Sequence, residues 1–405
     1  MYLLHRYIYF YRTPFVYVRI ESSTVVYGFG EGKPVKQDVY IGRVGTGGTI
    51  SFRTLIDIAT RTNQETTASL STFKVTAIKD AGTEFATTVT KSGSEWNTAE
   101  TYYWPNYALK FYAYANGPAA GKGRVSITKD AKTITDFTPA GNVTEHKDLL
   151  VAYNTGTKDN YNSSPVPLTF KHALSQIEVK AKNEKASSVK VEIIGVKLVN
   201  MATKATLTFP ESTLDNTKLP INNWSNQTDL NIPSKAYYSN GTKAVVLNST
   251  EFQSVMFGEN NFMVIPQQIT AWNAVKNDPD AEINKQGAYL AVLCRISNLS
   301  EAGETLIYPA PTADDPKTGK YAYSAVAINT KTINQWEPGK KYVYNLTFCS
   351  DGGGAGKVDP NPENPGGNSN TDETPGTGGE DILGGPIKFS ITVEDWETVE
   401  VLTDM

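Results

Sequence analysis

The sequence predicts an all-β protein built of β-sandwich domains. Tyrosine accounts for 22 of the 405 residues, and aromatic residues make up 11% of the chain. Aromatic and β-branched residues favour strands because their side chains pack well on a pleated surface. Apolar and polar residues alternate in short runs between Gly-, Pro- and Asn-rich turns, and no convincing long helical period is present. Short strands separated by turns are typical of a β-sandwich.

The C-terminal segment 384–405 carries a clear strand pattern. Its apolar residues alternate with polar ones and therefore share one face: Ile387, Phe389, Ile391 and Val393. The preceding residues 350–383 are rich in Gly, Pro, Asn and acidic residues, which predicts a flexible linker. A strand with one apolar face on a flexible tether needs an acceptor groove, so we interpret 384–405 as a C-terminal donor strand.

The burial of that apolar face stabilises a contact only modestly. Each of the four large side chains contributes about 1.5–3 kcal/mol when buried. Ordering the backbone opposes this gain at about 1–2 kcal/mol per residue. A durable contact therefore also needs the ladder hydrogen bonds of a strand pair and two further apolar side chains, Trp396 and Val399.

Residues 49–61 contain a strand of the same chemistry near the other end of the chain. One face of this strand carries Ile50, Phe52, Thr54, Ile56 and Ile58. Two strands with one chemistry can compete for one groove. Arg61 follows at the start of a polar stretch, and exposed loops are where proteolysis concentrates. We interpret 49–61 as a removable first strand, and Arg61 as either a solvated loop residue or the site where a trypsin-like protease separates that strand from its domain.

The strands of the sandwiches themselves fall into two regions. An N-terminal β-sandwich over 62–164 and a C-terminal β-sandwich over 165–349 meet at a polar, turn-rich stretch. Within 168–182 the apolar phase slips by one residue at Ser175-Gln176, which predicts a β-bulge. The candidate strands are residues 70–77, 102–115, 148–153, 168–182, 189–199, 261–267, 288–296, 321–328 and 341–348.

Residues 1–48 form an atypical N-terminal extension. Residues 1–20 are apolar and aromatic but carry Arg6, Arg12 and Arg19, and these charges argue against a transmembrane helix. The basic head, clean apolar centre and small-residue cleavage site of a signal peptide are not visible. Two interpretations stay open: an unusual extension, or a start displaced from that of the native precursor.

The composition argues against several classes of function. A net charge of -4 without a dense basic patch argues against a nucleic-acid partner. With three histidines and no Ser-His-Asp pattern, phosphate loop or Cys/His cluster, the sequence predicts no enzyme, no metal site and no cofactor. His172 lies on a strand face between Phe170 and Leu174, which predicts a packed core histidine. Cys294 is expected to be a buried thiol, and whether it pairs with Cys349 stays open.

Seven runs, spread in order from about Ser51 to the end of the chain, carry a resemblance to a known family. They are STFKVTA at 71–77, YYWPNYALKFYAYA at 102–115, KDLLVA at 147–152, LTFKHALSQIEVKAKN at 168–183, FMVIPQ at 262–267, WEPGKKYVYNLTF at 336–348 and PIKFSITVEDW at 386–396. Together they resemble the fimbrillin family of Bacteroidetes, the Mfa-like pilins of type V pili. None of the seven is a catalytic motif.

The resemblance implies two tandem transthyretin-like β-sandwich domains, a lipoprotein precursor, cleavage by an arginine-specific protease and polymerisation by donor-strand exchange. It places Arg61 at the processing site, residues 50–58 at the released strand and residues 387–399 at the donor strand. It also implies other pilin subunits as partners and a pilus at the cell surface and outer membrane that contributes to adhesion. The chain departs from the family at the lipobox cysteine, because its first cysteine is Cys294.

Two alternatives stay open. The C-terminal strand can fold back into its own chain, because a long tether permits that as well as exchange between subunits. The chain can also be a non-polymerising surface module whose exposed aromatic residues bind a glycan or a host protein. The candidate residues for such binding are Trp224, Trp272 and Trp336, although Trp336 is expected to pack at a strand entrance.

Overall fold

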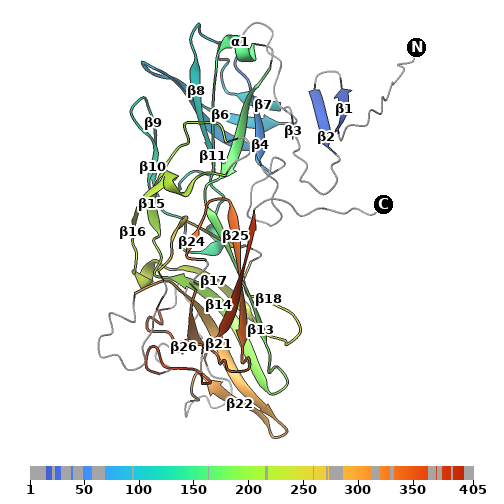
Figure 1. Ribbon diagram of the computed structural model, residues 1–405, viewed down its shortest axis with the longest axis vertical. Helices are drawn as coiled ribbons and strands as arrows, with labels where there is room; N and C mark the ends of the chain where they lie inside the picture. Colours follow the sequence, from blue (N-terminus) through green and yellow to red (C-terminus); the bar gives the residue numbers. More distant parts are fainter. Residues whose placement is uncertain are drawn as a thin grey trace, which may run out of the picture.

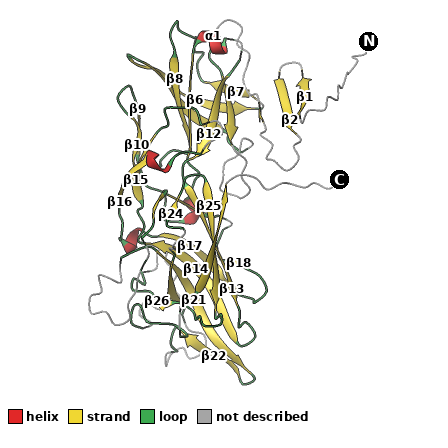
Figure 2. Cartoon of the chain, in the orientation of Figure 1, coloured by secondary structure: helices red, strands yellow, loops and turns green. Residues whose placement is uncertain are grey.

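The prediction of an all-β protein is confirmed. In the computed structural model strands dominate, and the helices of the described part are short, such as α1 (Lys158–Tyr161) (Figure 2). The structure describes residues 15–20, 23–28, 38–39, 49–56, 69–93, 95–162, 164–214, 218–258, 260–270, 272, 286–311, 320–328, 333–363, 371, 376–384 and 386–395.

A seven-stranded sheet forms the upper part of the elongated molecule (Figure 1). Along β5, Phe73, Val75 and Ala77 alternate inward into its core, as the period of a half-buried strand requires. The strand order is β4-β12-β11-β8-β5-β6-β7. The bounds are β4 (Phe52–Ile56), β5 (Thr72–Lys79), β6 (Gly82–Ser92), β7 (Glu95–Thr98), β8 (Leu109–Ala115), β11 (Leu150–Gly156) and β12 (Val166–His172).

The chain enters the lower part of the molecule later than its sequence predicts. β12 pairs with β11 and β4 of the upper sheet, although it lies beyond the boundary expected at Ser164. It ends at His172, and β13 (Ser175–Asn183) begins in another sheet. The slip in apolar phase at Ser175-Gln176 is therefore the break between two strands, and the predicted β-bulge is wrong. The exact division of the chain into domains stays a prediction.

A small four-stranded sheet joins the upper and lower parts. Its residues Ile134 and Leu207 share one buried cluster with Tyr112 and Val151 of the upper sheet and with Met263 of the lower part. The strand order is β16-β15-β10-β9. The bounds are β9 (Arg124–Ile127), β10 (Lys132–Phe137), β15 (Lys204–Thr208) and β16 (Trp224–Thr228).

Two sheets form the lower sandwich, and their inward residues build a single core. Ile177 and Val179 of one sheet share this core with Val191 and Val292 of the other, and all four are fully buried. One sheet has the order β18-β13-β25-β27 with β19 beside β13, and the other has β17-β14-β21-β23-β26 with β22 beside β21.

The lower strands have the following bounds. They are β14 (Val189–Val199), β17 (Tyr237–Val246), β18 (Gln253–Ser254), β19 (Phe262–Val264), β21 (Tyr289–Ser300), β22 (Gly303–Tyr308), β23 (Ala322–Ala327), β25 (Lys340–Phe348), β26 (Lys357–Val358) and β27 (Lys388–Asp395). The short strands β20 (Gln267–Gln268) and β24 (Gln335–Trp336) pair with each other. In the N-terminal extension, β1 (Phe15–Ile20), β2 (Ser23–Gly28) and β3 (Asp38–Val39) form a separate sheet.

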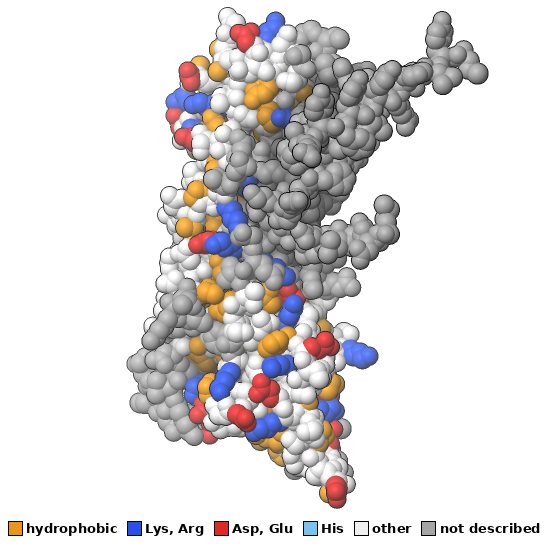
Figure 3. Space-filling view, turned by 45° about the vertical axis from the view of Figure 1, so that its right-hand side comes forward, with side chains coloured by type: hydrophobic (Ala, Val, Ile, Leu, Met, Phe, Trp, Pro, Cys, Tyr) orange, Lys and Arg blue, Asp and Glu red, His pale blue; other side chains and the backbone are white. Residues whose placement is uncertain are grey.

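Charged side chains of both signs are interspersed over the face shown in Figure 3. Lys190 is a partly exposed charged residue, and its Nζ lies 3.2 Å from a carboxylate oxygen of Glu192 and 3.3 Å from one of Glu304. Partly exposed pairs of this kind contribute about 0–1 kcal/mol each. The stability of the fold therefore rests on its buried clusters rather than on its surface ion pairs.

His146 connects the segment around residues 140–146 to the lower sandwich through hydrogen bonds. It is buried and directly follows the short helix η1 (Val143–Glu145). The backbone N–H of Met263 donates to His146 Nδ1 at 2.7 Å, and Nε2–H donates to the carbonyl of Ala140 at 2.7 Å. Only the neutral ring with its proton on Nε2 satisfies both bonds. Burial lowers the pKa of His146 from 6.5 to about 4.

We expect His146 to make the protein less stable in mild acid. The unfolded chain binds the imidazole proton more readily than the folded one, so this stabilisation is complete above pH 6.5 and is lost as the pH falls towards 4. The loss is on the order of 3 kcal/mol. Urea unfolding of the wild type and of His146→Gln at pH 7.5 and pH 4.5 measures it. A smaller pH dependence is expected in the variant, and equal pH dependence in both proteins would contradict the assignment.

Candidate assembly site

β4 fills a place at the edge of the upper sheet, beside β12, that we call the β4 slot. Phe52 is 1% exposed, and its ring centroid lies 6.3 Å from that of Phe73 and 5.6 Å from that of Phe111, both in edge-to-face geometry. Ile50 and Trp104 belong to the same buried cluster. Removal of β4 would therefore open a pocket lined with aromatic rings.

The backbone of β4 is bonded as an edge strand. It runs parallel to β12, with Phe52 opposite Val166 and Thr54 opposite Leu168. Just before the strand, the N–H of Val166 donates to the carbonyl of Ser51 at 2.8 Å. β4 is the terminal strand of the sheet order, so its departure would leave the outer edge of β12 without a partner.

Thr54 is a part of this site that sequence reasoning did not single out. Its side chain is fully buried, and its Oγ1 has no hydrogen-bond partner among the described residues. A buried hydroxyl without a partner costs about 1–3 kcal/mol in proteins. The signal in the sequence is a lone polar residue on a face otherwise formed by Ile and Phe.

Arg61 lies outside the described residues, and so does Ile58. β4 ends at Ile56, whose backbone is opposite Phe170 in β12, and β5 begins at Thr72. Cleavage at Arg61 would cut the only covalent path from β4 to β5. The assignment of Arg61 as the processing site stays a prediction.

The predicted C-terminal strand is β27, and it folds back on its own chain. It pairs antiparallel with β25, with Ile391 opposite Tyr344 and Phe389 opposite Leu346 (Figure 1). Ile387 is buried just before the strand, and Ile391 is half-buried against the lower core. β27 is also the last strand of its sheet order, so both segments that are predicted from the sequence to exchange form sheet edges.

Some residues of the predicted donor strand are not described. The side chains of Phe389 and Val393 lie outside the described part, as do Trp396 and Val399 altogether. The donor role of this strand stays a prediction, and the fold-back arrangement is the one that this structure shows.

The prediction of a flexible linker over 350–383 is wrong for the parts that the structure describes. β26 pairs antiparallel with β23, and the N–H of Ala355 donates to the carbonyl of Ile382 at 3.0 Å. Val358 lies in the lower core together with Ala355 and Ile382. The Gly- and Pro-rich composition concealed these few apolar residues and the backbone bonds that fix them.

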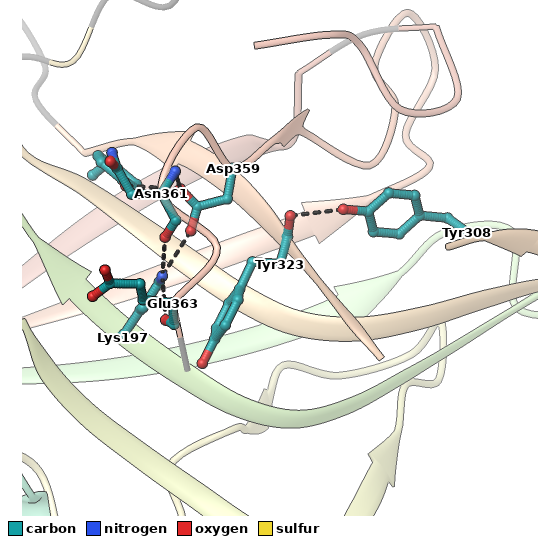
Figure 4. A network of polar contacts seen from close by, with 7 residues as sticks. Lys197, Tyr308, Tyr323, Asp359, Asn361 and Glu363 are labelled. Atoms are coloured by element: carbon teal, nitrogen blue, oxygen red, sulfur yellow. Dashed lines mark hydrogen bonds and ion pairs between the residues drawn. The ribbon is translucent and has the colours of Figure 1, made fainter. Parts of the chain in front are cut away.

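A buried ion pair fastens the same segment to the lower sandwich. Lys197 of β14 and Asp359 are 3% and 1% exposed, and the Nζ of the lysine lies 2.8 Å from the Oδ2 of the aspartate (Figure 4). Nζ also donates to the backbone carbonyls of Asn361 at 2.7 Å and Glu363 at 3.1 Å. The ammonium group of Lys197 thus contacts three residues of this segment: Asp359, Asn361 and Glu363.

Two tyrosines complete this polar network. The hydroxyl of Tyr289 donates to Asp359 Oδ1 at 2.8 Å, and the Nζ of Lys197 lies 4.0 Å from the centre of the Tyr323 ring. Burial, followed by the charge of Asp359, raises the pKa of Tyr289 well above its ordinary value. Sequence reasoning missed this network because Asp359 is one of several acidic residues in a region that looks solvated.

The three tryptophans considered as binding residues are buried. The expected packing of Trp336 is confirmed, and the exposure that binding through Trp224 and Trp272 requires is contradicted. Trp336 is fully buried and its Nε1–H donates to the hydroxyl of Tyr344 at 3.0 Å. Trp224 donates to the carbonyl of Ala173 at 2.7 Å, and Trp272 is 4% exposed. Trp224 and Trp336 are therefore core residues, each with its ring buried and its indole N–H hydrogen-bonded, as is usual for buried tryptophans.

The residues considered for chemistry are buried in this fold. His172 is buried as predicted, with Nδ1 2.8 Å from Oδ2 of Asp148. Cys294 and Cys349 are free and buried, which confirms the buried thiol at Cys294, and burial raises the pKa of both thiols. Within the described ranges, no three His, Cys, Asp or Glu side chains gather as metal ligands would, and no helix there has the length and hydropathy to cross a membrane.

These features define an all-β protein whose first and last candidate strands lie at sheet edges, the kind of edge on which strand addition can join subunits. A family model described as fimbrillin-like matches residues 43–361, and the chain belongs to this family. The resemblance stated from the sequence is thereby confirmed. Membership of this family supports a role as a fimbrial subunit or in adhesion at the cell surface.

The solved structures that match the chain include fimbrial proteins of low sequence identity. A fimbrial protein from Bacteroides vulgatus is 15% identical, with 86% of this chain and 99% of that chain covered and a TM-score of 0.46. A fimbrilin from Porphyromonas gingivalis is 12% identical, with 88% and 99% covered and a TM-score of 0.43. The tip fimbrial protein Mfa3 from the same organism is 8% identical, with 84% and 99% covered and a TM-score of 0.33. No curated protein sequence matches the chain.

Proposed function

We propose that this chain is a structural subunit of a type V pilus, and that it polymerises by protease-triggered donor-strand exchange. The observation that carries the proposal is the position of β4. It is an edge strand whose side chains fill an aromatic core, and its covalent path to β5 runs through Arg61. Once cut at Arg61, β4 would be held by non-covalent contacts alone.

The proposed reaction needs no catalytic group of this chain. An arginine-specific protease cleaves after Arg61, and the fragment that carries β4 dissociates. The C-terminal strand of another subunit leaves its own β25 and enters the empty β4 slot. Because this contact is head-to-tail and does not close on itself, its repetition produces a filament.

The proposed partners are therefore other pilin subunits and the processing protease, and the proposed location is a pilus at the cell surface and outer membrane. Adhesion to a host protein or glycan belongs to the same proposal. A non-polymerising module that binds glycan through Trp224, Trp272 and Trp336 is disfavoured because all three side chains are buried.

Proteolysis of the purified chain tests this function. We expect an arginine-specific protease to release a product that begins at Thr62, and the treated protein to form ladders in gels run without boiling. Arg61→Gln should remain monomeric, whereas Arg124→Gln, at an exposed arginine of β9, should polymerise as the wild type does. Wild type that is cut at Arg61 yet stays monomeric would refute polymerisation by this route, and ladders from Arg61→Gln would refute Arg61 as the trigger.

A further inference from the structure

The two candidate strands carry mostly apolar side chains at every second residue, and a single parallel alignment superposes their phenylalanines, Phe389 and Phe52. With Phe389 placed on Phe52, Ile387 coincides with Ile50. The same alignment brings Ile391 onto Thr54 and Val393 onto Ile56. A shift of one residue would turn the whole apolar face towards solvent.

The shape of the β4 slot distinguishes the remaining alignments. The Phe52 position is enclosed by the rings of Phe73 and Phe111, and the Thr54 position is fully buried. A shift of two residues in one direction puts Phe389 at the Thr54 position, where a phenyl ring overfills a site built for threonine. A reversed strand either does the same or, with Phe389 kept at the Phe52 position, brings Val393 onto Gly48 and so places one apolar residue fewer on the face of the slot. A shift of two in the other direction puts Ile391 at the Phe52 position and leaves part of the aromatic pocket empty.

The alignment with Phe389 at the Phe52 position also removes the buried hydroxyl of Thr54 from the β4 slot. Thr54 buries a hydroxyl without a hydrogen-bond partner, and Ile391 would bring a purely apolar side chain to the same place. In its present position beside β25, Ile391 is only half-buried. Transfer to the β4 slot would therefore increase the burial of Ile391 and end the burial of the Thr54 hydroxyl.

We propose that the C-terminal strand of a second copy enters the β4 slot parallel to β12, with Phe389 at the Phe52 position and Ile391 at the Thr54 position, and that the replacement of Thr54 by Ile391 favours exchange over the resident strand. This inference rests on the proposed function and specifies its partner and register. The resident strand is thus a weaker occupant of the slot than the strand that replaces it.

A disulfide between two copies tests the register. In the present structure Leu55 is opposite Thr169 of β12. If Phe389 takes the place of Phe52, Thr392 takes the place of Leu55 and comes opposite Thr169. Neighbouring residues of paired strands lie about 5 Å apart at Cα, which a disulfide can span. We expect cleaved Thr169→Cys protein mixed with a Thr392→Cys donor to form a crosslinked dimer under mild oxidation.

Two matched donors carry the cysteine two residues away, as Ser390→Cys or Glu394→Cys. A mixture of proteins without added cysteine is the control for crosslinks formed by the native thiols Cys294 and Cys349. Preferential crosslinking of Thr392→Cys supports the proposal. Preferential crosslinking of either matched donor would overturn the register while leaving strand exchange intact. Ladders without any crosslink to Thr169 would overturn the β4 slot as the acceptor, and the lack of ladders in every mixture, wild type included, would overturn the proposed function with it.

The rate of assembly tests the second half of the proposal. Thr54→Val removes the hydroxyl from the resident strand and should slow ladder formation after cleavage by about tenfold, since a buried hydroxyl without a partner destabilises by that order. Thr54→Ser keeps the hydroxyl and is the matched control. Ile391→Thr in the donor should slow assembly to a similar extent. Assembly of Thr54→Val at the wild-type rate would show that the hydroxyl does not drive exchange.

Discussion

A chain that ends at Gly384 is expected to be cleaved at Arg61 but to stay monomeric. The truncation removes β27 and Ile387, so no donor strand is left for the β4 slot of a neighbour. The end point follows from the structure, because Ile382 is buried and its carbonyl accepts from the N–H of Ala355. A cut before Ile382 would damage the lower core as well as remove the donor.

The truncated chain should be less stable than the wild type, because Ile387 leaves the lower core and β25 keeps only one of its two neighbouring strands, β13. Sizing after proteolysis must therefore be accompanied by a circular dichroism melt that shows a folded protein. A full-length Phe389→Asp variant is the matched test, since it keeps the chain length and places a charge on the apolar face. Both proteins are expected to give cleaved monomers, and ladders from either folded protein would contradict the role of this strand.

The sequence could predict where the two terminal strands lie but not which strands they pair with. Strand alternation is a local property, so Phe52 and Ile387 can be assigned to apolar faces from their neighbours alone. Pairing depends on residues far apart in the chain. The parallel contact of β4 with β12, and the return of β27 to β25, follow from long-range packing that no local pattern encodes.

The polar residues that matter were the hardest to foresee. Thr54 looks ordinary in a Thr-rich chain, and only its full burial without a partner makes it informative. Asp359 lies in a stretch whose composition is typical of a flexible linker, yet its carboxylate is buried against Lys197. Composition averages over a segment, whereas a single buried charge with a partner can order it.

Lys197→Met is expected to lower the free energy of unfolding by about 3–5 kcal/mol, because it leaves the buried carboxylate of Asp359 without its cation. It also removes the donor for the carbonyls of Asn361 and Glu363. The double variant Lys197→Met/Asp359→Leu removes both charges and should recover much of the loss, since apolar residues can replace a buried pair at little cost.

Urea unfolding of the two single variants and the double variant, as a double-mutant cycle, measures this coupling. The matched control is Lys190→Met, whose partly exposed pairs with Glu192 and Glu304 should contribute less than about 1 kcal/mol. A loss in Lys197→Met no larger than in this control would show that the ion pair does not hold residues 357–363 in place. The expected large loss would instead make this segment a fixed base for β27, so that strand exchange has to displace only the residues after Gly384.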